Sequence, residues 1–206
     1  MATFVEVHPD NPQPRTVGQV VERVREGDLV AFPTDSGYAL GGRLDDQAIK
    51  DRIRDIRQLD DKHHYTLLCA DFAQLGQLVL IDNSIFRAIK SATPGPYTFI
   101  LPATKEVPKR LLHAKKKTVG VRIPSHPLSR ALLDGLGDPM LISTLILPGE
   151  DQTPTFGWDV KEALDHQVDI VVDAGEVSTE PTTVVDLSSG EAVIARYGAG
   201  DPAPFE

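Results

Sequence analysis

The sequence has one cysteine and no long apolar run, and both absences limit what the protein can be. Cys69 stands alone among 206 residues, so the chain holds no internal disulfide, as is usual in reducing compartments. It lies in an apolar run, where an inert, buried thiol is expected. No run approaches the ~18 apolar residues of a membrane helix, and the start lacks a basic and then apolar signal sequence. We therefore expect a soluble, cytoplasmic protein.

Familiar phosphate and metal motifs are missing as well. There is no G-x-x-x-x-G-K-[ST] loop, no G-x-G-x-x-G opening a helix and no H-E-x-x-H pair. A lone cysteine excludes zinc sites built from cysteines, and the six histidines follow no metal-ligand spacing. The sequence thus predicts no protein-bound metal and gives the histidines surface or structural roles.

Charge is distributed unevenly along the chain. The net charge is −9, yet residues 105–130 hold eight basic side chains against one acid. A basic band on an acidic body can attract phosphates locally, whereas consecutive lysines can also form a merely solvated loop. The band supplies the candidate RNA contacts, which are Lys109, Arg110, Lys115, Lys116 and Lys117.

Helical and strand-like patterns interleave, which favours an α/β fold in one domain spanning residues 1–206. Apolar periodicity predicts helices at 16–26, 46–58, 72–80, 83–92, 126–136 and 158–166. Short apolar runs predict strands at 29–32, 66–70, 97–102, 119–123, 141–147, 168–172, 182–187 and 192–196. Because few helices separate the later strands, we expect a mixed sheet.

Two segments place glycine and proline directly beside strand candidates. Residues 31–42 read AFPTDSGYALGG, and residues 94–101 read PGPYTFIL. In the first, the glycines predict a permissive loop that carries the hydroxyls of Thr34, Ser36 and Tyr38. Such a loop can bind a small zwitterion, or its hydroxyls can simply cap neighbouring backbone.

Arginines in apolar surroundings form a second group of candidates. Arg122 and Arg196 lie in otherwise apolar strands, and Arg57 lies near a helix end. A guanidinium in such a place needs an anion, either an acidic neighbour or a ligand carboxylate or phosphate. Hydroxyls near the ends of strand candidates can join them: Ser143, Thr144, Thr182 and Thr183. Threonine is also an ordinary strand residue.

Three motifs, in order along the chain, resemble the YrdC/YciO family. They are PTDSGYAL at 33–40, PGPYTFIL at 94–101 and VGVRIPSHP at 119–127. HPDNP at 8–12 and RIRDIRQL at 52–59 resemble its YciO branch. The resemblance, from about residue 8 to residue 205, implies a twisted, open, mixed sheet with surrounding helices and a concave basic cavity.

The best-known members of that family are threonylcarbamoyl-AMP synthases. The resemblance therefore implies L-threonine, bicarbonate and ATP with Mg²⁺ as ligands, and a link to tRNA modification. It implies threonine contacts from Thr34, Tyr38 and Arg122. It implies nucleotide contacts from a larger set, namely Arg57, Lys62, Ser143, Thr144, Thr183 and Arg196.

The sequence departs from the synthases at two positions. Their Lys-x-Arg pair reads Asp55-Ile56-Arg57 here, and their Ser-x-Asn reads Thr144-Leu145-Ile146. A reaction that gathers several anions depends on fixed cations and donors, and losing one donor typically costs about a hundredfold or more in rate. We therefore expect ligand binding with weak or lost turnover. The alternative function is a double-stranded RNA-binding module that recognises phosphates by shape.

Overall fold

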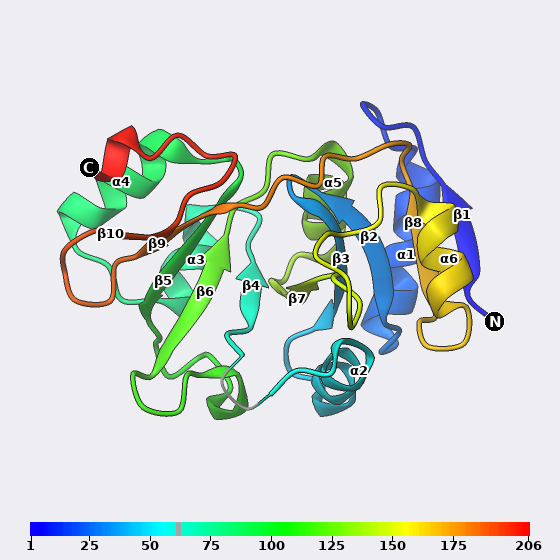
Figure 1. Ribbon diagram of the computed structural model, residues 1–206, viewed down its shortest axis with the longest axis horizontal. Helices are drawn as coiled ribbons and strands as arrows, with labels where there is room; N and C mark the ends of the chain where they lie inside the picture. The colour runs from blue at the N-terminus through cyan, green and yellow to red at the C-terminus, as the bar shows by residue number, and fades with distance from the viewer. Residues whose placement is uncertain (61–62) are drawn as a thin grey trace.

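The computed structural model describes residues 1–60 and 63–206, which form one mixed sheet of ten strands (Figure 1). The strands are β1 (Thr3–Glu6), β2 (Val30–Thr34), β3 (Gly37–Arg43), β4 (Thr66–Leu68), β5 (Tyr97–Pro102), β6 (Thr118–Arg122), β7 (Met140–Thr144), β8 (Ile170–Asp173), β9 (Thr183–Asp186) and β10 (Val193–Arg196). Their spatial order is β1-β8-β2-β3-β7-β4-β6-β5-β9-β10. The expected α/β fold with a mixed sheet is confirmed.

Helices surround the sheet. They are α1 (Pro14–Arg25), α2 (Gln47–Arg57), α3 (Phe72–Leu78), α4 (Asn83–Ala92), α5 (Pro127–Leu136) and α6 (Gly157–Leu164), with short 3₁₀ turns at Lys109–Leu111 and Ala203–Phe205. Aspartate side chains at 46, 71 and 82 accept hydrogen bonds from the first turns of α2, α3 and α4, which explains where these helices begin. Across residues 1–60 and 63–206, every helix is too short or too polar to span a bilayer.

Two apolar clusters fill the space between the helices and the sheet. Four valines of α1 and the leucines of α5 pack with Phe32, Ile142 and Val172 on one face. The other cluster contains the stripe of α2, formed by isoleucines 49, 53 and 56, and extends through the half of the sheet that carries β5 and β9. Periodicity of 3.6 in the sequence therefore identified the buried faces of these helices.

The segment expected to be a loop after residue 32 is a tight β-hairpin. β2 pairs with β3 from Val30↔Gly41 to Thr34↔Gly37, so that only Asp35 and Ser36 form the turn. Strand β3 was not predicted because its sequence, GYALGGR, has few strand-forming side chains. Its glycines allow close packing: a Cβ at Gly41 would lie 2.8 Å from the ring of Phe32.

In the middle of the sheet, successive side chains along a strand point alternately into the core and toward an open face. In β5 and β6, Phe99 and Val121 are buried in the core, while the next residues along each strand, Ile100 and Arg122, line a cavity on the other face. Residues 174–182 cross this region from the end of β8 to the start of β9, and thereby connect the two halves of the sheet (Figure 1).

Gly37 is expected to be the glycine of the hairpin least tolerant of substitution. Its φ is +88°, and a Cβ there would overlap the hydroxyl of Thr153. Gly149 has a similar φ of +87° but has open space around it. We expect Gly149→Ala to lower the free energy of unfolding by about 1–2 kcal/mol through backbone strain alone. Gly37→Ala should cost a further ~1–3 kcal/mol because the site is already filled.

Urea denaturation followed by circular dichroism measures both variants. Equal losses for the two alanine variants would show that Thr153 moves aside without cost.

Candidate functional site

A cavity of about 440 Å³ lies on the open face of strands β4 to β7, β9 and β10. The hairpin turn, the end of α2, the loop between β7 and α6 and the segment before β9 complete its wall. Among the described lining residues are three arginines (Arg57, Arg122 and Arg196) and a single carboxylate, that of Asp151. The arrangement is therefore suited to hold an anion.

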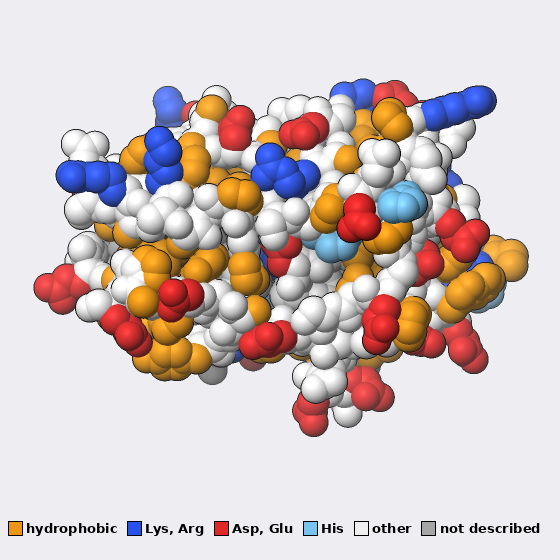
Figure 2. Space-filling view, turned by 90° about the horizontal axis from the view of Figure 1, so that it is seen from above, with side chains coloured by type: hydrophobic (Ala, Val, Ile, Leu, Met, Phe, Trp, Pro, Cys, Tyr) orange, Lys and Arg blue, Asp and Glu red, His pale blue; other side chains and the backbone are white. Residues whose placement is uncertain are grey.

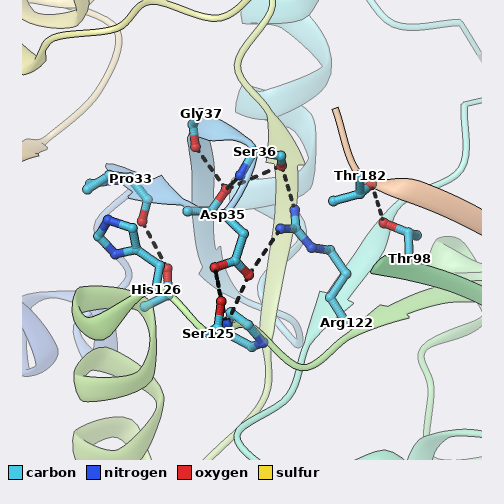
Figure 3. Close-up of polar contacts among 12 residues, drawn as sticks. Pro33, Asp35, Ser36, Gly37, Thr98, Arg122, Ser125, His126 and Thr182 are labelled. Carbon is cyan, nitrogen blue, oxygen red and sulfur yellow. Dashed lines mark hydrogen bonds and ion pairs between the residues drawn. The ribbon is translucent and has the colours of Figure 1, made fainter. Parts of the chain in front are cut away.

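Arg122 is buried in the wall of this cavity at the end of β6, with 2% of its surface exposed. Its Nη1 donates to Ser36 Oγ at 3.2 Å, and its Nη2 lies 3.9 Å from Asp35 Oδ2 (Figure 3). Burial lowers the pKa of Arg122 to about 10, an effect that Asp35 opposes. Of the two anions that the sequence left open, an acidic neighbour or a ligand, the acidic neighbour is present, and it comes from the turn of the β2–β3 hairpin.

Asp35 is itself held in place by the segment that follows β6. The backbone N–H and the hydroxyl of Ser125 both donate to its carboxylate, the hydroxyl at 2.7 Å (Figure 3). The carboxylate therefore offsets the charge of Arg122 at a distance longer than a hydrogen bond. Arg122 Nε and Nη2 have no hydrogen-bond partner among the described residues.

Arg57 reaches the cavity from the last turn of α2. Its Nη1 donates to Ser143 Oγ at 2.6 Å, and its Nε donates to the carbonyl of Ile146 at 3.3 Å. No carboxylate of the described residues forms an ion pair with it. Burial lowers the pKa of Arg57, as expected for a cation removed from water without an ion pair to a described carboxylate.

Arg196 enters from β10, and it too forms no ion pair with a described carboxylate. Its Nε and Nη2 donate to the carbonyl of Thr182 at 3.0 and 2.9 Å, and Thr182 Oγ1 lies 2.9 Å from Thr98 Oγ1 (Figure 3). Burial lowers the pKa of Arg196, and the charge of Arg196 in turn lowers that of Arg122. The two guanidinium groups thus lie close enough to repel each other across the site.

His63 and His64 also line the cavity, although the sequence gave histidines no ligand role. His63 Nε2 lies 3.4 Å from Ser143 Oγ, the same oxygen that accepts from Arg57. Burial, and then the charge of Arg57, lowers the pKa of His63 to about 4. The sequence offered one sign of this placement, since both histidines follow within a few residues the helix that presents Arg57. In the described residues, no group of three or more His, Cys, Asp or Glu could hold a metal ion.

The structure brings five of the predicted ligand-binding residues to this cavity: Arg57, Arg122, Ser143, Thr144 and Arg196. It places three others behind the wall. The hydroxyl of Thr34 donates to the Gly37 carbonyl, and that of Tyr38 donates to Asp173. The hydroxyl of Thr183 donates to the Gly200 carbonyl, while its neighbour Thr182 faces the cavity.

Successive side chains of a strand point to opposite faces of the sheet, so Thr183 points away from the cavity while Thr182 lines it. Thr34 and Tyr38 lie in the two paired strands of the hairpin, and their hydroxyls bond to Gly37 and Asp173 instead. Burial, and then the charge of Asp173, raises the pKa of Tyr38 well above its ordinary value. Lys62, a further predicted nucleotide contact, lies outside the described residues.

The basic residues considered for RNA binding lie outside the cavity lining. Arg110 donates to the carbonyl of Leu44, and Lys116 pairs with Asp186 at 3.6 Å. Lys109, Lys115 and Lys117 are exposed. Figure 2 shows the opposite, upper side of the molecule, where Lys and Arg side chains lie at separate points among acidic ones.

The fold and the cavity together define a class: open, mixed α/β sheets with a cavity on one face that several arginines line. Comparison with known proteins identifies the family. The Sua5/YciO/YrdC family model, described as "Telomere recombination", matches residues 22–198. The chain therefore belongs to this family.

Individual relatives agree with this assignment. An uncharacterized protein, YciO of Escherichia coli K12, is 48% identical over 205 residues. The match covers 100% of this chain and 100% of that protein. The crystal structure of E. coli YciO gives a TM-score of 0.96. A threonylcarbamoyl-AMP synthase of Pyrococcus abyssi is 32% identical over 179 residues, which are 85% of this chain and 52% of that protein.

A solved structure with a bound small molecule is also similar. Crystalline P. abyssi Sua5 complexed with L-threonine gives a TM-score of 0.87 at 27% identity. The match covers 96% of this chain and 58% of that one.

The depressed pKa of His63 predicts a specific loss of stability in acid. An unfolded chain would protonate this histidine near its ordinary pKa of 6.5, whereas the folded cavity resists protonation until about pH 4. The unfolded state therefore binds more protons in this window, and the free energy of unfolding falls as the pH falls. His63→Gln should lose less stability than the wild type between about pH 7 and about pH 5.

Urea denaturation at the two pH values measures the difference. His166→Gln is the control, because this histidine is 82% exposed and lies outside the cavity lining. An identical pH dependence of stability in His63→Gln and the wild type would contradict the prediction.

Proposed function

We propose that the cavity binds L-threonine and ATP and that the protein is a slow threonylcarbamoyl-AMP synthase. The observation that carries this proposal is the meeting of Arg57, Arg122 and Arg196 at one cavity, two of them without a carboxylate partner among the described residues. Family membership and the similarity to a threonine-bound Sua5 support the choice of ligands.

The reaction needs positioning and charge stabilisation more than a nucleophilic side chain. The amine of threonine attacks the carbon of bicarbonate, water leaves, and a carbamate forms. A carbamate oxygen then attacks the α-phosphorus of ATP. The bond from this phosphorus to the oxygen that bridges it to the β-phosphate breaks, and pyrophosphate leaves with that oxygen and the bonding electrons. Mg²⁺ accompanies the nucleotide as its counter-ion. Fixed guanidinium groups stabilise the negative charge that gathers at phosphorus.

In this scheme Arg122 holds the carboxylate or carbamate of threonine. Arg57, Ser143, Thr144 and Arg196 hold the phosphates and the nucleotide. The hydrogen bonds of Arg57 to β7 and of Arg196 to Thr182 fix both guanidinium groups before a ligand arrives. Such preorganisation is what a charge-stabilising site requires. The product would be an activated threonylcarbamoyl donor of the kind used in tRNA modification.

Slow turnover follows from the two departures from the synthases. The side chain of Asp55 is 70% exposed and pairs with Arg54 on the outer surface of α2, so it adds no charge to the cavity wall. Ile146 does line the cavity, and it offers only its backbone carbonyl, which accepts from Arg57. The site therefore lacks one cation and one amide donor, and losing a single donor typically costs about a hundredfold in rate.

Arg57→Ala should lower the rate of threonylcarbamoyl-AMP formation at least about a hundredfold, because it removes a fixed cation. Purified protein is incubated with ATP, L-threonine and bicarbonate, and the product is separated by liquid chromatography. Arg54→Ala is the matched control, since Arg54 lies on the same helix but pairs with Asp51 and Asp55. The absence of product from both the wild type and the control would refute the synthase proposal.

Double-stranded RNA binding is the second candidate, favoured by one contact. His113 accepts backbone hydrogen bonds from Lys115 and Lys116, and its ring lies 4.7 Å from that of His64 in the cavity wall. The lysine turn thus adjoins the cavity, and a polyanion bound there could extend onto it.

If RNA binds at this turn, replacing Lys115, Lys116 and Lys117 with alanine should weaken binding. It should also make the slope of log affinity against log salt concentration shallower, by the release of about three fewer counter-ions. Filter binding across a range of KCl concentrations measures both. An unchanged affinity and salt slope in the triple variant would exclude the lysine turn as an RNA site.

A further inference from the structure

Strand β1 leaves one side of its backbone open. In the described part of the chain, β1 pairs with β8 alone and forms an outer edge of the sheet (Figure 1). The N–H group of Thr3 donates to the carbonyl of Asp169, just before β8. Because neighbouring residues of a strand point their N–H and C=O groups to opposite sides, those of Phe4 and Glu6 point away from the sheet. Such an edge is a template on which another strand can pair.

Hydrophobic side chains lie beside this edge. The ring of Phe4 stacks on that of Trp158 in α6, with 4.3 Å between the ring centroids, and Trp158 is 61% exposed. Met1 and Phe156 are exposed as well. Figure 2 shows a group of hydrophobic side chains at the right-hand end of the molecule, which is the end that carries β1 and α6 in Figure 1. Hydrophobic surface next to an open strand edge is typical of an interaction site.

A second copy of β1 fits this edge. In an antiparallel pair centred on Phe4, the two Phe4 residues lie opposite each other and exchange both N–H···O bonds, with their Cα atoms about 5.5 Å apart. Residues that lie opposite each other in such a pair project their side chains to the same face. A two-fold axis perpendicular to the sheet therefore brings the two stacks of Phe4 on Trp158 together, on the face that carries α6.

Charge complementarity favours this register. Glu6 lies two residues after Phe4, so its side chain projects to the same face, and it forms no ion pair with a described residue. In the antiparallel pair, Glu6 comes opposite Ala2 of the second copy. The ammonium of Lys161 lies there, because it donates to the Ala2 carbonyl at 2.9 Å. Among the described residues it has one further acceptor, Asp165, which leaves its third N–H for the incoming Glu6.

We infer that the protein forms a two-fold dimer in which the β1 strands of two copies pair in antiparallel fashion. The second copy supplies, at each end of the pair, the cation that Glu6 lacks. The interface consists of four strand residues and a few side chains around α6, so the dimer is weak and dissociates on dilution. Neither β1 nor α6 contributes a lining residue to the cavity, and the dimer therefore does not depend on the proposed function.

Sedimentation velocity from about 5 to about 500 µM measures association of the protein without an added tag, and the wild type should shift from monomer toward dimer over this range. Glu6→Lys sets two cations against each other at both ends of the pair, so it should weaken association at least about tenfold. Glu191→Lys is the matched control. It makes the same charge change at an exposed residue before β10, at the opposite edge of the sheet, and should associate like the wild type.

Hydrogen exchange followed by mass spectrometry tests whether β1 is the contact. In a concentrated wild-type sample, a peptide of residues 1–12 should retain about two more amide hydrogens than in a dilute one, because the outward N–H groups of Phe4 and Glu6 become bonded. The same peptide of Glu6→Lys should exchange alike at both concentrations. Equal urea midpoints for Glu6→Lys and Glu191→Lys show that both variants remain folded.

Three results would overturn the inference. The first is a wild type that remains monomeric at about 500 µM. The second is a Glu6→Lys variant that associates as strongly as the wild type. The third is a wild-type dimer in which exchange of the amino-terminal peptide does not slow, as is expected if the copies meet through β10 or through another surface.

Discussion

The burial of one cation, Arg122, is the constraint on which the site depends. A guanidinium removed from water needs compensation, and the chain supplies only part of it: one carboxylate beyond hydrogen-bond distance and one hydroxyl. That partial compensation requires the β2–β3 hairpin to turn within two residues, so that Asp35 and Ser36 face β6. The hairpin, strand β6 and the segment through Ser125 thus meet at a single buried charge.

Much of this architecture could be read from the sequence, because it depends on local periodicity. The range predicted for α4 and the range predicted for β5 match the structure residue for residue, and Ile49, Ile53 and Ile56 form the buried stripe of α2 that their spacing indicated. Strands β1 and β3 were missed for different reasons. β1 is a four-residue edge strand, and β3 is rich in glycine because it packs against Phe32 and α2. Glycine selected for close packing resembles glycine selected for a loop when only the sequence is known.

The candidate site was predictable where chemistry is unusual for its surroundings and unpredictable where it is ordinary. Arginines in apolar strands stand out, and all three proposed from the sequence reach the cavity. Thr183 could not be separated from Thr182, because one residue of strand register decides which hydroxyl faces a cavity. Thr34 and Tyr38 could not be separated from Ser36, because the sequence did not show where the hairpin turns. His63 and His64 were missed because their contacts with β7 and with His113 join residues far apart in the chain.

The two ends of the chain differ in how close they lie to the cavity lining. Strand β1 forms one outer edge of the sheet and β10 the other (Figure 1). Only β10 contributes a lining residue, Arg196, and the tail after it packs back through Phe205 onto Tyr97 and Phe99. An affinity tag or fusion partner joined after residue 206 is therefore attached to the segment that follows a cation of the cavity wall. The same addition before residue 1 is attached next to β1, which contributes no residue to the cavity lining. For ligand-binding measurements, the amino terminus is therefore the better place for a purification tag or a fluorophore.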